Sequence, residues 1–142
     1  MTAPVILKTD DRNVERAIAW VRAIESGQTG DALVDFLTPD VIHEEMPNRF
    51  FPNGGKSDLA AMRAASKRGQ TAMRSQCYDI KSATGNGDMV AIELDWSAEL
   101  AIPLGELPPG AVLKARVALF MEFRDGRICR QRDYCCYEPI GG

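Results

Sequence analysis

The C-terminal segment of the chain, ARVALFMEFRDGRICRQRDYCCYEP, is typical of a β-hairpin. Residues 115–123 and 127–137 are rich in alternating apolar, β-branched and aromatic residues, and they predict two long strands. Asp125 and Gly126 lie between them, where they can take the positive φ that a tight hairpin turn requires. The segment therefore predicts an antiparallel pair, and the register of that pair decides which side chains share a face.

The length of the hairpin loop allows two registers. With Asp125-Gly126 alone as the loop, Asp133 lies opposite Ala118, and both faces of the pair mix apolar and charged side chains. With Arg124-Asp125-Gly126 as a loop closed by a glycine bulge, Asp133 lies on an apolar face with Val117, Leu119, Met121, Phe123, Cys129, Cys135 and Tyr137. The other face then carries Arg116, Glu122, Arg130 and Arg132. One apolar and one charged face is typical of a half-buried sheet, so we favour the bulged register.

Asp133 is therefore predicted to be an acid on the inner face of the sheet. A carboxylate surrounded by Val, Leu, Met and Phe side chains loses solvation of its charged form, which suits it to general acid or base catalysis. The structural alternative is that Asp133 pairs with an arginine or reaches the rim of the sheet, as many strand carboxylates do. The hairpin alone leaves both interpretations open.

Length and composition predict one ordinary domain, residues 1–142. The chain is 45% hydrophobic and 26% charged, so it can bury a proper core. Its net charge of −3 and its pI near 5.2 argue against a nucleic-acid partner. No apolar run approaches a membrane span and no secretion signal is recognisable, so we expect a cytoplasmic protein without a membrane partner. The four cysteines follow no metal or disulfide spacing and are interpreted as reduced strand residues: Cys77, Cys129, Cys135 and Cys136.

Ahead of the hairpin, the pattern predicts three helices followed by strands. The first helix covers 13–26, a short second helix begins at Asp31 and ends at 38–40, and a third is capped by Ser57 and ends at Gly69. A brief strand, 41–46, precedes the third helix. The later runs predict long strands over 72–83, 88–101, 112–123 and 127–137. This order predicts an α+β barrel-like cone, in which a curved antiparallel sheet wraps over three N-terminal helices.

Two segments make the chain similar to a known family. They are FLTPDVIHEEMPNRFFPNGGKSDLAAM and FRDGRICRQRDYCCYEP, in which a short strand, Met-Pro, a glycine turn, a helix and a hairpin ending in Arg-Asp-Tyr follow one another. The chain resembles the SnoaL-like branch of the nuclear-transport-factor-2-like superfold, which includes polyketide cyclases, ketosteroid isomerases and limonene epoxide hydrolase. The resemblance covers about residues 13–139 and implies the cone fold. It leaves the reaction open, because this fold hosts many chemistries.

The resemblance implies catalytic roles for three polar residues. Asp133 matches an aspartate that transfers protons in the pocket of the limonene epoxide hydrolase type. His43 and Glu45 match positions that help to hold the nucleophilic water there, and they lie on one face of their strand. A lone histidine on a strand is more often structural, so that interpretation also stays open for His43. No second histidine supports a metal site, and we expect neither a metal nor a cofactor.

A second pair of acids lies on the central strand, 88–101. The resemblance places Glu93 and Asp95 where the epoxide hydrolase has an arginine and an aspartate. Asp95 is therefore a further catalytic candidate. Because Glu93 replaces the arginine, we do not expect the catalytic triad of the epoxide hydrolase here. Alternation predicts the reverse orientation, with the acids outside and the apolar set inside, namely Val90, Ile92, Leu94 and Trp96. The acids can face the pocket, as the resemblance implies, and the apolar residues can still be buried if the outer face forms a homodimer interface. That interface would contain Ile92, Leu94 and Trp96.

The expected ligand is a hydrophobic, oxygenated small molecule held in the cone. Its expected wall consists of Val117, Leu119, Met121 and Tyr137. Phe50 and Phe51 flank a glycine pair that can hinge and are expected to cover the ligand, with simple packing as the alternative. The first function class is a cofactor-independent acid-base enzyme of the hydrolase, isomerase or cyclase/dehydratase type. The second is a non-catalytic member of the same fold that binds a ligand or a protein. The inner acids favour the enzyme.

Overall fold

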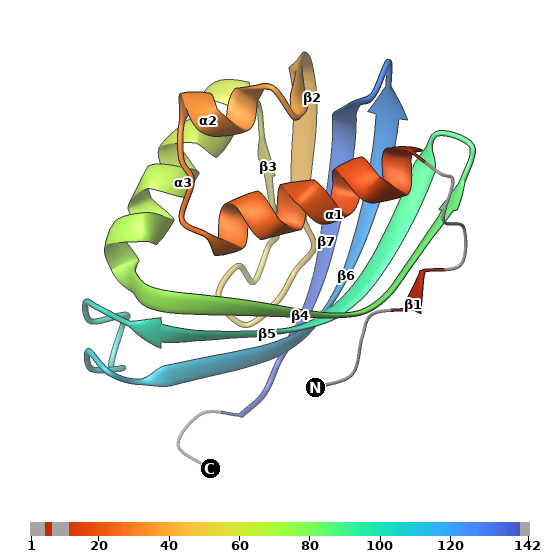
Figure 1. Ribbon diagram of the computed structural model, residues 1–142. Coiled ribbons are helices and arrows are strands. Elements are labelled where there is room, and N and C mark those ends of the chain that lie inside the picture. Colours follow the sequence, from red (N-terminus) through yellow and green to blue (C-terminus); the bar gives the residue numbers. More distant parts are fainter. Residues whose placement is uncertain (1–4, 7–11, 140–142) are drawn as a thin grey trace.

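The computed structural model describes residues 5–6 and 12–139 (Figure 1). Its elements are β1 (Val5–Ile6), α1 (Arg12–Glu25), α2 (Asp31–Val34), β2 (Leu37–Glu45), β3 (Gly55–Ser57), α3 (Leu59–Ala72), β4 (Met73–Asn86), β5 (Met89–Leu100), β6 (Val112–Arg124) and β7 (Arg127–Tyr137). Three helices ahead of four long strands confirm the predicted α+β order. No helix in the described part of the chain is long and apolar enough to cross a membrane.

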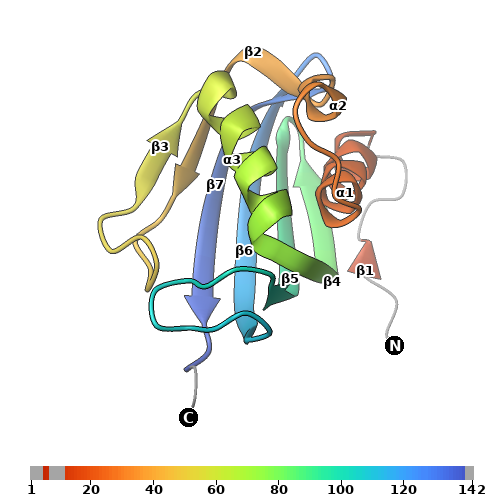
Figure 2. The same cartoon turned by 90° about the vertical axis from the view of Figure 1, so that its left-hand side faces the viewer.

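The strands form one curved sheet in the order β1-β4-β5-β6-β7-β2-β3. Neighbouring strands are antiparallel except for two parallel pairs, β1 with β4 and β2 with β7. The two outermost strands of the described sheet, β1 and β3, do not pair with each other, so the predicted cone is confirmed as an open sheet and the term barrel does not apply to it. Figures 1 and 2 show α1 crossing the concave face, while α3 passes over the part of that face nearest β2 and β7.

The core lies between α1 and the concave face of the sheet. The buried residues of α1 recur at the spacing of one helix face: Val14, Ala17, Trp20, Val21 and Ala23. They pack with the inward side chains of the long strands, among them Ile80, Val90, Ile92, Leu94, Val117, Leu119, Met121, Phe123 and Ile128. Because this burial removes apolar surface from water, it fixes the side of each strand that faces α1.

The orientation of β5 corrects one expectation drawn from the family resemblance. Ile92 and Leu94 are buried beneath α1, whereas Glu93 and Asp95 are exposed on the outer face. The apolar side chains face the helix that covers them, as the alternation of the strand predicted. Asp95 therefore does not face the interior. Trp96 is also on the inner side and packs against the core, so the homodimer stays a prediction without the apolar stripe that supported it.

The turn of the β6–β7 hairpin also differs from the favoured register. It consists of two residues, Asp125 and Gly126, with φ of 52° and 78°, and Arg124 lies directly opposite Arg127. Positive φ at both central positions gives the turn that matches the twist of the flanking strands. The three-residue loop with its glycine bulge is therefore wrong.

A bulge inside β7 nevertheless places Asp133 on the predicted face. The pairing skips Cys129, so that Asp133 lies opposite Leu119 on the concave side. Ile128 and Gln131 are both buried, and strict alternation would have put these two residues on opposite faces. The extra residue at Cys129 lets both point inward, which is the effect of a bulge on the alternation of a strand.

The boundaries of the second and third helices differ from the predicted ones. α2 ends at Val34, and β2 begins with the buried Leu37, which the sequence placed in the helix. Ser57 belongs to β3, a short strand that was not predicted, and Asp58 caps α3 by accepting a hydrogen bond from a backbone N–H of its first turn. α3 continues past Gly69 and leads directly into β4.

Candidate active site

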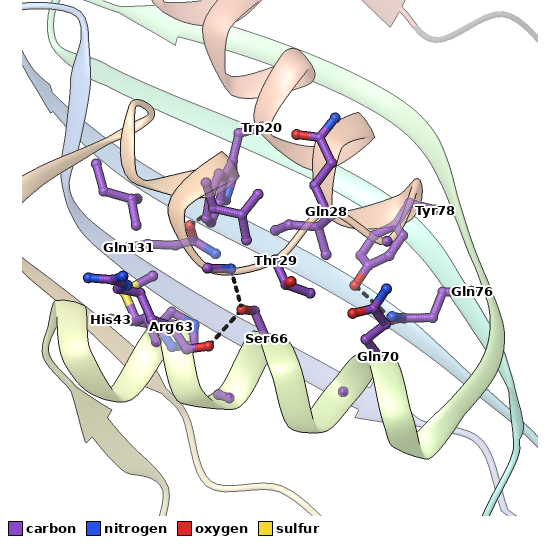
Figure 3. Close-up of a pocket in the computed structure, with 18 of the residues that line it drawn as sticks. Trp20, Gln28, Thr29, His43, Arg63, Ser66, Gln70, Gln76, Tyr78 and Gln131 are labelled. Atoms are coloured by element: carbon purple, nitrogen blue, oxygen red, sulfur yellow. Dashed lines mark hydrogen bonds between the residues drawn. The ribbon is translucent and has the colours of Figure 1, made fainter.

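A cavity of about 290 Å³ lies between α3, the loop 26–30 and the inner face of the sheet (Figure 3). Its apolar lining comes from α1, α2, β2 and α3 and comprises Trp20, Ile24, Leu33, Leu37 and Met62. Its polar lining comprises Gln28, Thr29, His43, Arg63, Ser66, Gln70, Gln76, Tyr78, Gln131 and Asp133. The volume is near the lower end of the range for small-molecule pockets, and the mixture of apolar walls with a few polar groups is typical of such pockets.

The roof of the cavity is formed by α3 and is held by a small number of polar contacts. The Gly30 N–H donates to Ser66 Oγ at 3.2 Å, and Arg63 forms an ion pair with Asp31 of α2. No residue of α3 is buried, although the whole helix is described. The floor is different, because it consists of paired strands.

A chain of hydrogen bonds fixes Asp133 at one end of the cavity. The Trp20 Nε1–H donates to Gln131 Oε1 at 3.0 Å, and Gln131 Nε2 donates to Asp133 Oδ1 at 2.7 Å. His43 Nε2 lies 2.8 Å from the other carboxylate oxygen, Oδ2. An indole N–H can only donate, so it fixes which end of the Gln131 amide faces it. Gln131 must therefore present its N–H to Asp133, which accepts on both oxygens.

The parallel pairing of β2 with β7 brings these residues together. His43 lies opposite Gln131, and Glu45 lies opposite Asp133. Residues two apart on a strand point to the same side, so all four side chains project from one face of the pair. The backbone N–H of Met46 donates to the Asp133 carbonyl at 2.9 Å and extends this pairing past the end of β2.

The electrostatics of the site raise the proton affinity of His43. Burial by itself lowers the pKa of His43, but the hydrogen bond to Asp133 and the charges of Asp133 and Glu45 outweigh it, so the pKa lies above its ordinary 6.5. Burial, followed by the neighbouring Asp133 charge, raises the pKa of Glu45 above 4.5. Among the described residues none hydrogen-bonds to His43 Nδ1, and this atom is not sealed from solvent.

Glu45 lies beside the cavity and does not line it. Cys135 Sγ donates to Glu45 Oε2 at 3.3 Å. Burial and the charges of Glu45 and Asp133 raise the pKa of the Cys135 thiol, so it stays protonated at neutral pH. Cys135 is therefore a polar filler and not a nucleophile, which agrees with reading the cysteines as reduced strand residues.

The structure brings together some of the predicted site residues and not others. Asp133 and His43 line the cavity, and Glu45 is their neighbour. Asp95 lies on the outer face of the sheet, 3.8 Å from Lys81 Nζ, and takes no part in the cavity. Of these four residues, only Asp95 on the central strand was assigned to the wrong face of the sheet.

The predicted ligand-binding residues lie elsewhere. Three of them, Val117, Leu119 and Met121, are buried in the core. Phe50 packs edge-on against Tyr137 with ring centroids 4.7 Å apart, so simple packing describes it, and Phe51 is exposed. None of the six predicted wall and lid residues lines the cavity.

Sequence reasoning missed two glutamines that line the cavity. They are Gln76 and Gln131, and neither carries a recognisable motif. Trp20, Tyr78 and one face of α3 also line the cavity. In the described part of the chain, no group of three or more His, Cys, Asp or Glu side chains is placed to hold a metal ion.

Comparison with known proteins identifies the family. Residues 17–131 match the SnoaL-like domain. The chain belongs to the SnoaL-like family. No protein with a curated description matches the sequence of this SnoaL-like chain.

Solved structures share the fold of this SnoaL-like protein. A candidate polyketide cyclase from Xanthomonas campestris pv. campestris has a TM-score of 0.72 and 26% identity, over 87% of this chain and 89% of that chain. The candidate polyketide cyclase IdmH from Streptomyces antibioticus has a TM-score of 0.72 and 19% identity, over 88% and 92%. An LEH-like epoxide hydrolase from M. tuberculosis has a TM-score of 0.70 and 17% identity, over 87% and 82%. An NTF2-like protein from Anabaena variabilis has a TM-score of 0.66 and 19% identity, over 99% and 96%. The nuclear-transport-factor-2-like fold is therefore confirmed.

Proposed function

We propose that this protein is an enzyme that transfers protons on an uncharged, partly apolar small molecule without a cofactor. The observation that carries the proposal is the His43–Asp133 pair, with 2.8 Å between Nε2 and Oδ2, at the wall of a cavity of about 290 Å³. A histidine with a raised pKa that is hydrogen-bonded to a carboxylate at the wall of a cavity is a usual setting for acid-base catalysis. The structural neighbours, which include candidate polyketide cyclases and an epoxide hydrolase, support a small-molecule reaction.

The geometry divides the work between the two residues. Asp133 accepts hydrogen bonds on both oxygens, so its part is to orient His43 and to stabilise the imidazolium that forms. His43 Nδ1 has no partner among the described residues and can take a proton from a ligand. His43 is therefore the catalytic base of the proposal, and Asp133 acts through it. This assignment gives the proton-transfer role to His43 and not to Asp133, the residue that the sequence favoured.

The chemistry that suits this pair is removal of a proton from a carbon next to a carbonyl. The C–H electron pair moves into the carbonyl to form an enolate, and the proton goes to His43 Nδ1. Return of that proton to a different atom isomerises the compound. Attack of the enolate on a second carbonyl carbon closes a ring, and the new alkoxide takes the proton from His43. When His43 takes a proton from water instead, the water oxygen attacks an epoxide carbon, the C–O bond of the epoxide breaks, and the departing oxygen takes the proton from His43. Each of these steps needs only a base whose conjugate acid returns the proton.

The decisive variant is Asp133→Asn. Asparagine keeps the size of the side chain, but it cannot accept hydrogen bonds from both Gln131 and His43 Nε2, because one of its two positions is now a donor. His43 then loses its fixed tautomer and its charge partner. We expect turnover to fall by about 100-fold or more with little change in ligand affinity.

Exchange in D₂O measures this step before the natural substrate is identified. Proton NMR follows the loss of α-hydrogens from a panel of cyclic ketones, and a parallel assay follows hydrolysis of epoxides. Asp95→Asn is the matched control, because it makes the same change on the outer face and should leave the rate unchanged. If the wild type binds such compounds but catalyses neither reaction, the protein is a ligand-binding member of the family and the catalytic proposal is wrong.

A further inference from the structure

Gln76 of β4 is held in one orientation by two donors. Its Oε1 accepts from the Trp96 Nε1–H at 3.0 Å and from the Tyr78 hydroxyl at 3.0 Å. The indole N–H can only donate, so the oxygen of the amide must face it. Trp96 is itself fixed edge-on against Tyr137, with ring centroids 6.1 Å apart. Gln76 therefore has little freedom to rotate or flip.

This orientation leaves the Nε2 group of Gln76 with two unused N–H donors. No described residue accepts a hydrogen bond from it, and the atom is not sealed away from solvent. Gln76 lines the cavity at the end opposite His43, as Figure 3 shows. A fixed amide that presents unpaired donors to a cavity is suited to bind an acceptor atom of a ligand.

The chemistry around Gln76 selects an uncharged acceptor. The charged residues of the described lining, His43, Arg63 and Asp133, belong to the other end of the cavity. The groups near Gln76 are neutral amides and hydroxyls, including Gln70 and Tyr78. No residue of the described lining at this end offers a counter-charge to a carboxylate or phosphate, whereas a ketone or ester oxygen needs none.

We infer that Gln76 is a substrate-recognition residue that binds a neutral carbonyl oxygen at the end of the cavity remote from His43. The inference rests on the proposed function, because it assigns the second end of the same ligand. The lining of the cavity also includes the apolar side chains of Trp20, Leu33 and Met62. The substrate class is therefore a compound with two oxygen functions separated by an apolar middle, one function reacting at His43 and the other recognised by Gln76.

Two probes of equal shape test the recognition step by binding alone. They are 2-decalone and 2-methylenedecalin, which differ only in having a carbonyl oxygen or a methylene group at one position. Dissociation constants are measured by NMR titration of the full chain, and the side-chain amide signal of Gln76 is followed in the same spectra. Because no turnover is needed, the result is independent of whether His43 is catalytic.

Gln76→Glu is the informative variant. Glutamate keeps an oxygen for Trp96 and Tyr78 but removes both N–H donors. Asn86→Asp is the matched control, because it makes the same change from amide to carboxylate at an exposed position of the same strand, outside the cavity lining. In the wild type and in Asn86→Asp we expect the ketone to bind about three- to tenfold tighter than the alkene, and in Gln76→Glu we expect this ratio to fall to about one.

Three results would overturn the inference. They are equal affinity of the two probes for the wild type, an unchanged ratio in Gln76→Glu, and an unmoved Gln76 amide signal on binding of the ketone, which includes the case of no binding. If the ketone binds more tightly than the alkene as expected, but no α-hydrogens of the ketone exchange in D₂O, the acid-base role of His43 is wrong. The recognition role of Gln76 then remains intact.

Discussion

His43 couples the stability of the fold to pH through its contact with Asp133. Because the pKa of His43 is higher in the folded protein than its ordinary 6.5, the folded state binds the proton more tightly than the unfolded chain does. This stabilisation is fully present below the ordinary value and is lost as the pH rises through the folded-state value. The free energy of unfolding of the wild type, measured relative to His43→Gln, should therefore decrease above pH 6.5.

Urea unfolding of both proteins over a range of pH measures this difference directly. Glu45 also has a raised pKa, and its charge is coupled to that of His43, so the same comparison in a Glu45→Gln background removes its contribution. The free energy of unfolding of the wild type relative to His43→Gln could instead increase with rising pH. Burial of His43 would then outweigh the charge of Asp133, and the proposed acid-base pair would be wrong.

Only part of the site was predictable from single residues. Asp133 was found because an acid among apolar strand residues is conspicuous, and His43 because it is the one histidine of the sequence. Gln131 was not found, because its role depends on the indole of Trp20, which is 111 residues away in the chain. A neutral amide gains meaning only from its partners, and no local pattern reveals them.

At the scale of the element, β5 offers a direct test of which face is buried. Leu94 is fully buried under α1, whereas the next residue, Asp95, is exposed on the outer face. Leu94→Ala should lower the free energy of unfolding by about 2 to 5 kcal/mol, because it removes buried methyl groups and leaves a cavity. Asp95→Ala should change it by less than about 0.5 kcal/mol. Urea unfolding of the two variants tests this expectation. Similar decreases in the free energy of unfolding would contradict the orientation of β5.

The hairpin shows why alternation predicted the face of Asp133 but not the path of the strand. The turn at Asp125-Gly126 and both strands were visible in the sequence. Ile128 and Gln131 are three apart, so an unbroken strand cannot bury both, and the bulge at Cys129 resolves this conflict. A bulge is chosen by what packs against the strand, so composition alone does not locate it.

At the scale of the whole molecule, the site depends on contacts between distant segments. His43 and Asp133 meet across 90 residues because β2 lies beside β7 in parallel. The helices, the long strands and their order followed from periodicity and turn residues. The position of the cavity did not, because α1 covers the part of the concave face that holds Leu119 and Met121, and the open part lies under α3. The placement of helices over a sheet is a tertiary property.

The contrast between α1 and α3 predicts unequal local stability. α1 buries five residues, whereas α3 buries none and forms the roof of the cavity. Backbone amides of α3 should exchange with D₂O at least about tenfold faster than those in the middle of α1, because α3 can open without exposing the core. Hydrogen exchange followed by NMR tests this, and a bound ketone should slow exchange in α3 selectively. Equal protection of the two helices would show that the roof opens only when the whole domain unfolds.

The two tryptophans also bear on how this site can change during evolution. Replacing either indole by phenylalanine would conserve most of the ring and would look like a mild substitution. It would nevertheless remove the single hydrogen atom that sets the direction of a glutamine amide, Gln131 through Trp20 and Gln76 through Trp96. Each amide could then invert and offer an oxygen where it now offers N–H groups. A lineage could in this way exchange the proton chemistry or the ligand of the cavity without altering any residue that touches the ligand's reacting atoms.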